Sequence, residues 1–294
     1  MTVQERSNPA AAAAAARLSK VASDVGATAS RGTAVASQQV ASAQRAARRA
    51  TVPRRTALAR GRPAFVVAVL GLLGFAALFA IVKARRSEAV DLAITLRLQR
   101  RRAPGLDRLM ALVSWPGFPP QSRVIPPAVI GGLWLLRFRT EAVFEVAAWG
   151  TGGLSTALKA MMDRPRPVAG TDLRVVAAPL GGTSFPSGHV ITFVGTYGFL
   201  AYLAATLVRD PLPRAALTGG LLGLVALVGP SRVYQGHHWP TDVTASYLLG
   251  TSYLIVVVAA YQRAKASEGR RRLTLPALPV RGLSSGPPIA AIRG

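Results

Sequence analysis

Only three histidines occur in this chain of 294 residues, and two of them are adjacent, His237 and His238. Histidine can exchange a proton or attack an electrophile near neutral pH. Adjacent residues of a helix point about 100° apart and rarely share one ligand, which argues against a metal-binding pair. Asp242 follows His238 by four residues, so on a helix its carboxylate lies on the same face and can orient the ring. The spacing selects His238 as the candidate nucleophile and leaves His237 without a catalytic role.

Fixed cations accompany these histidines. Lys159 and Arg166 are separated by six residues and precede the third histidine, His189, whereas Arg232 precedes His238 by six positions. Ammonium and guanidinium groups bind phosphate oxygens through charge-assisted hydrogen bonds. These residue types therefore predict a phosphate site.

The stretch Pro186-Ser187-Gly188-His189 leads directly into an apolar run. Proline suits the first turn of a helix, Ser187 offers a hydroxyl, and Gly188 permits a close backbone approach. The N–H groups at such a helix start bind anions. Taken singly, each cluster has an ordinary structural explanation, such as a snorkelling lysine or a capped turn. Together the clusters hold all three histidines at the ends of apolar runs, which favours one shared polar cavity.

The three clusters resemble the signature of the type-2 phosphatidic acid phosphatase family, K-x6-RP, PSGH and SR-x5-H-x3-D. All three parts are complete, as Lys159 to Pro167, Pro186 to His189 and Ser231 to Asp242. The resemblance implies a metal-independent phosphatase without a cofactor that works through a phosphohistidine. It also implies a role for each signature residue: His238 as nucleophile, Asp242 as its orienting partner, His189 as general acid, and Lys159, Arg166, Ser187, Gly188 and Arg232 as the groups that hold the phosphoryl oxygens.

Long apolar runs must position these residues, since half of the chain is hydrophobic. We expect an all-α integral membrane bundle of six helices, because runs of this kind are typical of membrane spans. A small-xxx-small pair, Gly219 and Gly223, predicts close packing of the fifth span. The long first loop contains a partly periodic segment that we expect to lie along the membrane interface. The six expected spans are residues 63–82, 124–136, 141–162, 189–208, 215–229 and 242–261.

Two basic tails flank the predicted phosphatase domain, residues 63–262. Residues 1–62 are rich in Ala, Arg and Ser and contain no aromatic residue, so we expect a disordered tail. Residues 263–294 form the second basic tail. The net charge of +24 is typical of contact with anionic lipid headgroups. Nucleic acid is not an expected partner, because no aromatic residue interleaves with the N-terminal charges.

Six spans put both tails on one side of the membrane. The tails and two short loops, at residues 137–139 and 209–214, carry 22 of the 36 basic residues. The positive-inside rule therefore predicts cytoplasmic tails and an active site on the outer face. Basic residues in the first loop conflict with this orientation. The Ala/Arg-rich composition favours a bacterial plasma membrane, and the absence of cysteine excludes thiol chemistry.

The expected substrate is a lipid phosphate presented at the membrane face. Polyprenyl diphosphate (undecaprenyl diphosphate in particular), phosphatidic acid and phosphatidylglycerophosphate all carry a suitable phosphoryl group, and the motifs do not separate them. A lipid phosphotransferase with the same phosphohistidine chemistry is the alternative. The apolar runs argue against a soluble vanadium haloperoxidase, which has a similar pocket. The complete motifs argue against a membrane scaffold without enzymatic activity.

Overall fold

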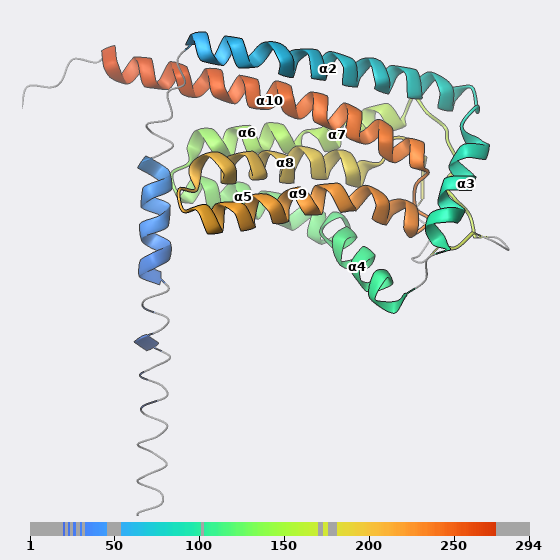
Figure 1. Cartoon of the computed structure of the whole chain (residues 1–294), viewed down its shortest axis with the longest axis horizontal. Coiled ribbons are helices and arrows are strands. Elements are labelled where there is room, and N and C mark those ends of the chain that lie inside the picture. The colour runs from blue at the N-terminus through green and yellow to red at the C-terminus, as the bar shows by residue number, and fades with distance from the viewer. Residues whose placement is uncertain are drawn as a thin grey trace, which may run out of the picture.

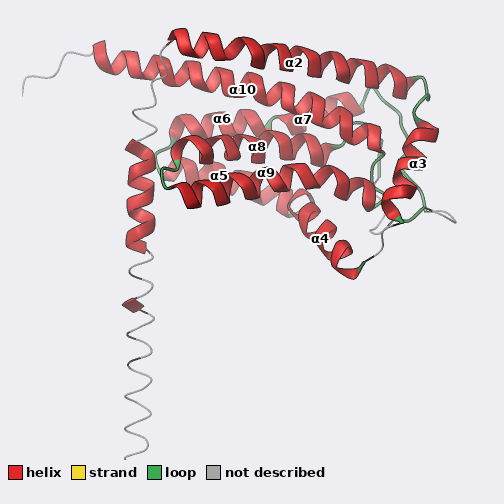
Figure 2. Cartoon of the chain, in the orientation of Figure 1, coloured by secondary structure: helices red, strands yellow, loops and turns green. Residues whose placement is uncertain are grey.

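The computed structural model describes residues 33–45, 54–100, 103–169, 173–175 and 181–274, together with five single positions between 20 and 30. Its described part consists of helices and loops without a strand, as Figure 2 shows, so the all-α prediction is confirmed. In chain order the elements are α2 (Arg54–Lys83), α3 (Glu88–Gln99), α4 (Pro104–Ser114), the 3₁₀ helix η1 (Trp115–Gly117), α5 (Gln121–Leu135), α6 (Arg139–Trp149), α7 (Thr151–Lys159), α8 (Gly188–Leu207), α9 (Pro211–Tyr234) and α10 (Pro240–Thr274).

The long helices run side by side, with α8 in the middle of the bundle (Figure 1). In α8 about 67% of the most apolar stretch is buried, against 11% in α2. A helix that is apolar all round suits such a central place. In α2, Phe65, Leu70 and Leu73 are more than 60% exposed, which is typical of a surface that faces lipid.

Four described helices, α2, α8, α9 and α10, are long and apolar enough to cross a membrane. Of the other two predicted spans, one coincides with α5, which has 15 residues. The other is interrupted at Gly150, where α6 ends and α7 begins. An integral membrane bundle is thereby confirmed, and the count of six crossings stays a prediction.

Close helix packing occurs at glycines that the small-xxx-small pattern does not identify. A Cβ on Gly195 of α8 would lie 2.3 Å from the carbonyl oxygen of Ala148, next to the interruption between α6 and α7. At Gly219 and Gly223 no described atom lies within 4 Å of such a Cβ, so the predicted packing there is wrong. The pattern fails because, in the described part of the chain, no helix approaches α9 at these two glycines.

Helix α3 confirms that the first loop contains a helical segment. Its polar side chains Asp91, Thr95 and Gln99, spaced four residues apart, are buried against the protein. Val90 and Ile94 are instead 58% and 47% exposed. This helix therefore turns its polar face to the bundle and its apolar face outward, the arrangement that suits a membrane interface.

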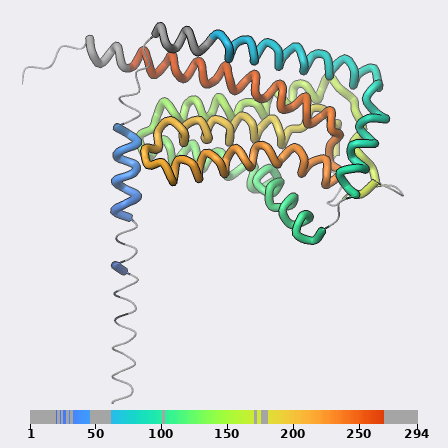
Figure 3. Tube along the Cα trace, in the orientation of Figure 1, coloured from blue at the N-terminus to red at the C-terminus, as the bar shows by residue number. Residues whose placement is uncertain are grey.

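The segment 33–45 is helical, which corrects the prediction of a disordered tail for these residues. It lies at the end of the bundle away from α3 (Figure 3). Val40 and Ala43 pack against the hydrophobic core, and the Gln39 side chain donates a hydrogen bond of 2.8 Å to Asp210. Alanine favours a helix, and these contacts supply the partner that the segment lacks by itself. Most of the predicted tail lies outside the described residues.

The predicted domain boundary at residue 262 falls inside α10, which continues to Thr274. The residues after 262 are mostly good helix formers, and Lys265 forms an ion pair of 3.0 Å with Glu141 of α6. The helix therefore continues past the apolar run. Residues 275–294 lie outside the described residues.

Candidate active site at one end of the bundle

The three sequence clusters meet at the end of the bundle that α3 covers (Figure 1). Lys159 is the last residue of α7, and His189 lies in the first turn of α8. Arg232 lies in the last turn of α9, and His238 occupies the short loop before α10. Antiparallel helices bring these distant segments together, because helix ends that alternate along the chain share one face of a bundle.

His238 is held at both ring nitrogens. Its Nδ1 lies 2.8 Å from the carbonyl oxygen of Ser184, and its Nε2 lies 3.2 Å from Nη1 of Arg166. A carbonyl only accepts and a guanidinium only donates, so the proton of the neutral ring sits on Nδ1. This tautomer leaves the lone pair of Nε2 on the side of the cations, as a nucleophile for phosphorus requires.

Asp242 lies close to His238 but is not its principal hydrogen-bond partner. Its Oδ2 is 3.6 Å from Nδ1 of His238 and accepts a hydrogen bond of 2.9 Å from the backbone N–H of Trp239. We expected Asp242 to accept the hydrogen bond that orients the His238 ring. In the structure the backbone carbonyl of Ser184 accepts it instead. Asp242 does lie near His238, but not on a shared helix face, because α10 begins at Pro240 and His238 lies in the loop before it. A backbone carbonyl of a loop has no sequence signal.

Arg164 is a hydrogen-bond partner of Asp242 that no sequence motif indicated. Its Nη1 donates to Oδ1 of Asp242 at 2.5 Å, and its Nη2 donates to Asp91 of α3 at 2.6 Å. The Arg164 side chain is only 8% exposed. The signature residue Arg166 follows two positions later, and a basic residue followed by proline at 164–165 was the one available signal.

Lys159 and Arg166 hold the loop that carries Ser184. The Lys159 ammonium donates to the carbonyl oxygen of Thr183 at 2.8 Å, and Nη2 of Arg166 donates to the same oxygen at 3.2 Å. Arg166 also donates to the backbone carbonyl of His237 at 2.8 Å. Both predicted phosphate-binding cations therefore lie within reach of His238, and carbonyl groups hold them in place.

The PSGH cluster leads into α8 as predicted, but Pro186 precedes the N-cap residue and does not lie in the first turn. Ser187 is the N-cap residue and Gly188 begins the helix. The backbone N–H of Ser187 donates to Oγ of Ser246 at 2.7 Å, which anchors the helix start to α10. Oγ of Ser187 and Nε2 of His189 are buried and have no hydrogen-bond partner among the described residues. Such atoms are the expected ligands of a bound anion or a leaving group.

Arg232 is fully buried and carries unused donors. Its Nη1 donates to Gln235 at 3.0 Å, and its guanidinium carbon lies 4.8 Å from the centre of the Phe118 ring. Its Nε and Nη2 find no acceptor in the described part of the chain. A buried cation without a partner anion is costly, so this arrangement favours an anionic ligand.

The His237 ring makes no hydrogen bond to the described residues of the cluster. Its side chain is 2% exposed, and neither ring nitrogen has a partner among the described residues. Burial, together with Arg232 and Arg166, lowers the pKa of His237 to about 3. The His237 ring packs against the Phe118 ring, with 5.9 Å between the ring centres. This packing agrees with the expectation that His237 has no catalytic role.

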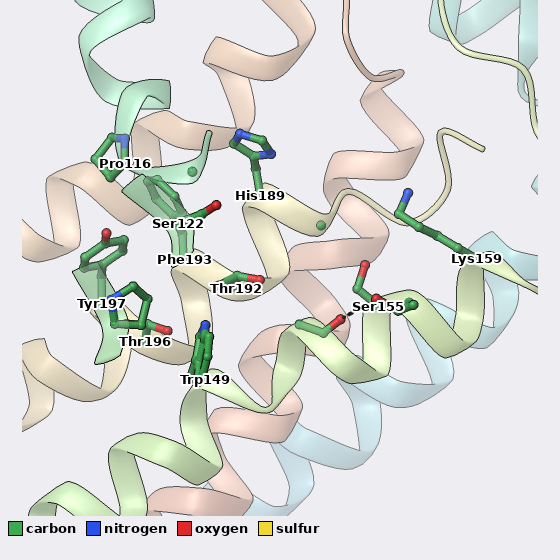
Figure 4. A pocket seen from close by; sticks show the side chains of 15 residues that line it. Pro116, Ser122, Trp149, Ser155, Lys159, His189, Thr192, Phe193, Thr196 and Tyr197 are labelled. Carbon is green, nitrogen blue, oxygen red and sulfur yellow. Dashed lines mark hydrogen bonds between the residues drawn. The ribbon is translucent and has the colours of Figure 1, made fainter. Parts of the chain in front are cut away.

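A cavity of about 240 Å³ extends from Lys159 and His189 along α8 toward Trp149. In Figure 4, Lys159 lies on one side of this cavity, Tyr197 and Pro116 lie on the opposite side, and His189 and Trp149 lie between them. Hydroxyl groups of Ser155, Thr192 and Thr196 alternate with apolar side chains along its wall. The cavity can therefore take a group that is partly polar and partly apolar and that remains attached to a phosphate at the His189 end.

Burial and the neighbouring cations both shift the pKa of His238 in the direction that favours the neutral ring. Burial lowers the pKa of His238 well below 6.5, and Arg232, Arg166 and Lys159 lower it further. The ring is therefore neutral, and able to attack, over the physiological pH range. Burial also lowers the pKa of the Arg166 guanidinium, which remains a cation.

No group of three His, Asp or Glu side chains in the described ranges could hold a metal ion. The site is instead rich in arginine and lysine donors. Metal independence stays a prediction for a chelator experiment.

The helical membrane bundle and its cluster of two histidines and three cations define a membrane phosphatase that acts on phosphate esters. Residues 142–266 of this chain match the family model of the PAP2 superfamily. It is 29% identical over 192 residues to phosphatidylglycerophosphatase B of Bacillus subtilis (strain 168), a match that covers 63% of this chain and 90% of that protein.

A solved structure agrees with the fold. The crystal structure of a transmembrane PAP2-type phosphatidylglycerolphosphate phosphatase from Bacillus subtilis superposes with a TM-score of 0.58. The superposition covers 67% of this chain and 96% of that one, at 24% identity. This similarity supports the arrangement of the helices.

Proposed function

We propose that this protein hydrolyses a membrane lipid phosphate through a covalent phosphohistidine at His238. The orientation of the His238 ring carries the proposal. Its Nδ1 donates to Ser184, so its Nε2 lone pair lies on the side of Arg166, 3.2 Å away. A buried neutral imidazole next to fixed cations is suited to attack a phosphorus atom.

In the first step Nε2 of His238 attacks phosphorus and the bond from phosphorus to the lipid oxygen breaks. His189 enters this step as an imidazolium, which the negative charge of the bound phosphate favours, and donates its proton to that leaving oxygen. Lys159, Arg166 and Arg232, with the Ser187 hydroxyl and the Gly188 N–H, hold the three remaining phosphoryl oxygens. Stabilising these oxygens is the main catalytic contribution in phosphoryl transfer.

In the second step water attacks the phosphohistidine. His189, now neutral, accepts a proton from the water, the P–N bond breaks, and inorganic phosphate leaves. His238 and His189 thereby return to their starting states. No metal or cofactor takes part in either step.

Phosphatidylglycerophosphate is the first substrate to test, because the curated relative is named for that activity. Its leaving group carries a glycerol next to the reacting phosphate. The hydroxyl-lined cavity beside His189 suits such a group, whereas phosphatidic acid would leave an apolar diacylglycerol and polyprenyl diphosphate would leave a polyprenyl phosphate. Polyprenyl diphosphate and phosphatidic acid are the competing substrates.

The test is phosphate release from each of the three lipids by purified protein in detergent with a chelator present. We expect turnover of phosphatidylglycerophosphate, an acid-labile phosphoenzyme, and loss of both with His238→Ala. His237→Gln is the matched variant and should still form the phosphoenzyme. Turnover by His238→Ala would refute the phosphohistidine, and loss of turnover with the chelator would refute metal independence.

For the orientation we propose cytoplasmic tails and an outward-facing site, on the distribution of basic residues. The chain has no cysteine, so maleimide labelling of a variant reports on the introduced cysteine alone. Glu88 at the site end and Arg137 at the other end are both exposed. A membrane-impermeant maleimide added to intact cells should label Glu88→Cys and spare Arg137→Cys. The reverse pattern would invert the topology.

A further inference from the structure

One buried guanidinium joins two carboxylates behind the nucleophile. Arg164 donates from Nη1 to Asp242 at 2.5 Å and from Nη2 to Asp91 at 2.6 Å. The Asp91 and Asp242 side chains are 1% and 0% exposed. The three groups come from three segments, since Asp91 lies on α3, Arg164 in the loop after α7, and Asp242 on α10.

The Asp91 carboxylate is fully satisfied. Its Oδ1 accepts the backbone N–H of Thr241 at 2.9 Å, and its Oδ2 accepts the Thr241 hydroxyl at 2.8 Å. Nη2 of Arg164 also donates to Oγ of Ser87 at 3.1 Å. A buried charge network of this kind is rigid, because each group has few alternative partners.

Arg164 also reaches His238 by a second route. The backbone N–H of Ser184 donates to the carbonyl oxygen of Arg164 at 2.8 Å, and the carbonyl of Ser184 accepts the Nδ1 proton of His238 at 2.8 Å. One residue therefore positions both the carboxylate near His238 and the carbonyl that holds its ring.

We propose that Arg164 and Asp91 are positioning residues for the nucleophile, which hold Asp242 and Ser184 against His238. The proposal rests on the proposed function, in which Nε2 of His238 attacks phosphorus. When Nε2 carries the phosphoryl group and Nδ1 keeps its proton, the ring becomes a cation. Two carboxylates with one guanidinium leave a net negative charge beside that ring, which favours the intermediate over the neutral ground state.

Stability alone is a poor explanation for this network. Burying two carboxylates and a guanidinium costs desolvation energy, and apolar residues of similar volume often stabilise a core as well or better. The network lies 3.6 Å from the His238 ring, at the point where charge develops.

The other charged or titratable groups around His238 are cationic or neutral. Arg166 belongs to the loop before α8, Arg232 to α9 and Lys159 to α7, and each lowers the pKa of His238. His189 on α8 and His237 in the same loop complete the set. The carboxylates of Asp242 and Asp91 therefore supply the negative charge that offsets these three cations near His238.

The test compares Asp91→Asn with Glu88→Gln, a matched change at an exposed position of the same helix. We expect Asp91→Asn to lower kcat by about 100-fold, the cost of a small misplacement at a reacting centre, while KM stays unchanged. Loss of the negative charge disfavours the imidazolium, so the pKa of His238 falls and the acid limb of the rate profile moves to lower pH. Glu88→Gln should change neither quantity.

A second comparison separates positioning from folding. Arg164→Gln leaves two buried carboxylates without a cation and should be more damaging than Asp91→Asn. The double variant Arg164→Gln/Asp91→Asn removes one carboxylate as well and should recover part of kcat. Additive losses, or a fall in kcat that tracks only the yield of folded protein, would refute the positioning role.

A readout without substrate keeps the two proposals apart. The ¹⁵N shift of the His238 ring, titrated in detergent, should report a lower pKa in Asp91→Asn than in the wild type. If the wild type hydrolyses no lipid phosphate, the proposed function fails whatever the titration shows. If the wild type is active and Asp91→Asn matches it in kcat and in the titration, the positioning proposal alone fails.

Discussion

The Nδ1 atom of His238 lies 2.8 Å from the carbonyl oxygen of Ser184. This relationship fixes the tautomer of the nucleophile through a backbone acceptor that cannot be protonated. Asp242, at 3.6 Å, is then placed to act on the cationic ring of the intermediate rather than to orient the neutral ring. The Ser184 carbonyl thus orients the neutral ring, and the Asp242 carboxylate acts on the cationic ring. These separate roles lead to predictions about pH and about each neighbouring group.

The acid limb of activity should lie below pH 6.5. Burial lowers the pKa of His238, and Arg232, Arg166 and Lys159 lower it further, so the attacking neutral form persists as the pH falls. Protonation, and loss of activity, then occur only at the lowered pKa. Single-turnover rates of phosphoenzyme formation across pH measure this limb. Arg166→Gln removes a neighbouring cation and should move the limb upward; a wild-type limb at or above 6.5 would contradict the burial effect.

Replacing Arg232 by a neutral residue should reduce activity more than replacing it by lysine, which keeps the positive charge but not the planar guanidinium. Its buried Nε and Nη2 have no partner in the described part of the chain, so we expect them to bind phosphoryl oxygens. Arg232→Gln should lower kcat/KM by about 100- to 1,000-fold, the usual cost of removing one transition-state donor. Arg232→Lys keeps the charge without the planar fork and should fall between. Equal activity of the glutamine variant and the wild type would exclude a role in phosphate binding.

The cavity beside His189 should determine affinity for the lipid. Ser155 of α7 lines it, whereas His238 does not, and Ser155→Leu fills space in the cavity. We expect KM for the lipid to rise about tenfold. Hydrolysis of a small soluble phosphate ester should be spared. Ser267→Leu, the same change at an exposed position of α10, is the control. Equal effects on the lipid and on the soluble ester would place the leaving group elsewhere.

Gly195 should be essential for packing. An added Cβ would lie 2.3 Å from the backbone oxygen of Ala148, which has little room to shift. Gly195→Ala should therefore destabilise the protein by about 1–3 kcal/mol, the typical cost of overpacking. Thermal unfolding in detergent checks this. Gly219→Ala meets no described atom within 4 Å and should leave the midpoint unchanged or slightly raised. Equal midpoints for the two variants would contradict the close approach.

Sequence spacing alone identified the apolar runs that became the long helices and the residues that lie at their ends. It also predicted that Asp242 lies near His238, and the two side chains are 3.6 Å apart, although His238 lies in the loop before α10 and not on the helix that the prediction assumed. The interruption at Gly150 escaped it, since hydropathy does not register a break within an apolar run. Gly195 of α8 approaches Ala148 closely beside this break.

What only the tertiary structure decided is how the nucleophile is held. Ser184 acts through its carbonyl, which every residue type possesses, and Arg164 meets Asp91 across 73 positions of the chain. Neither contact follows from local periodicity, because each depends on how the loop before α8 folds back between α3 and α10. Local spacing determined which residues are available for phosphate chemistry, and long-range packing determined which partners orient them.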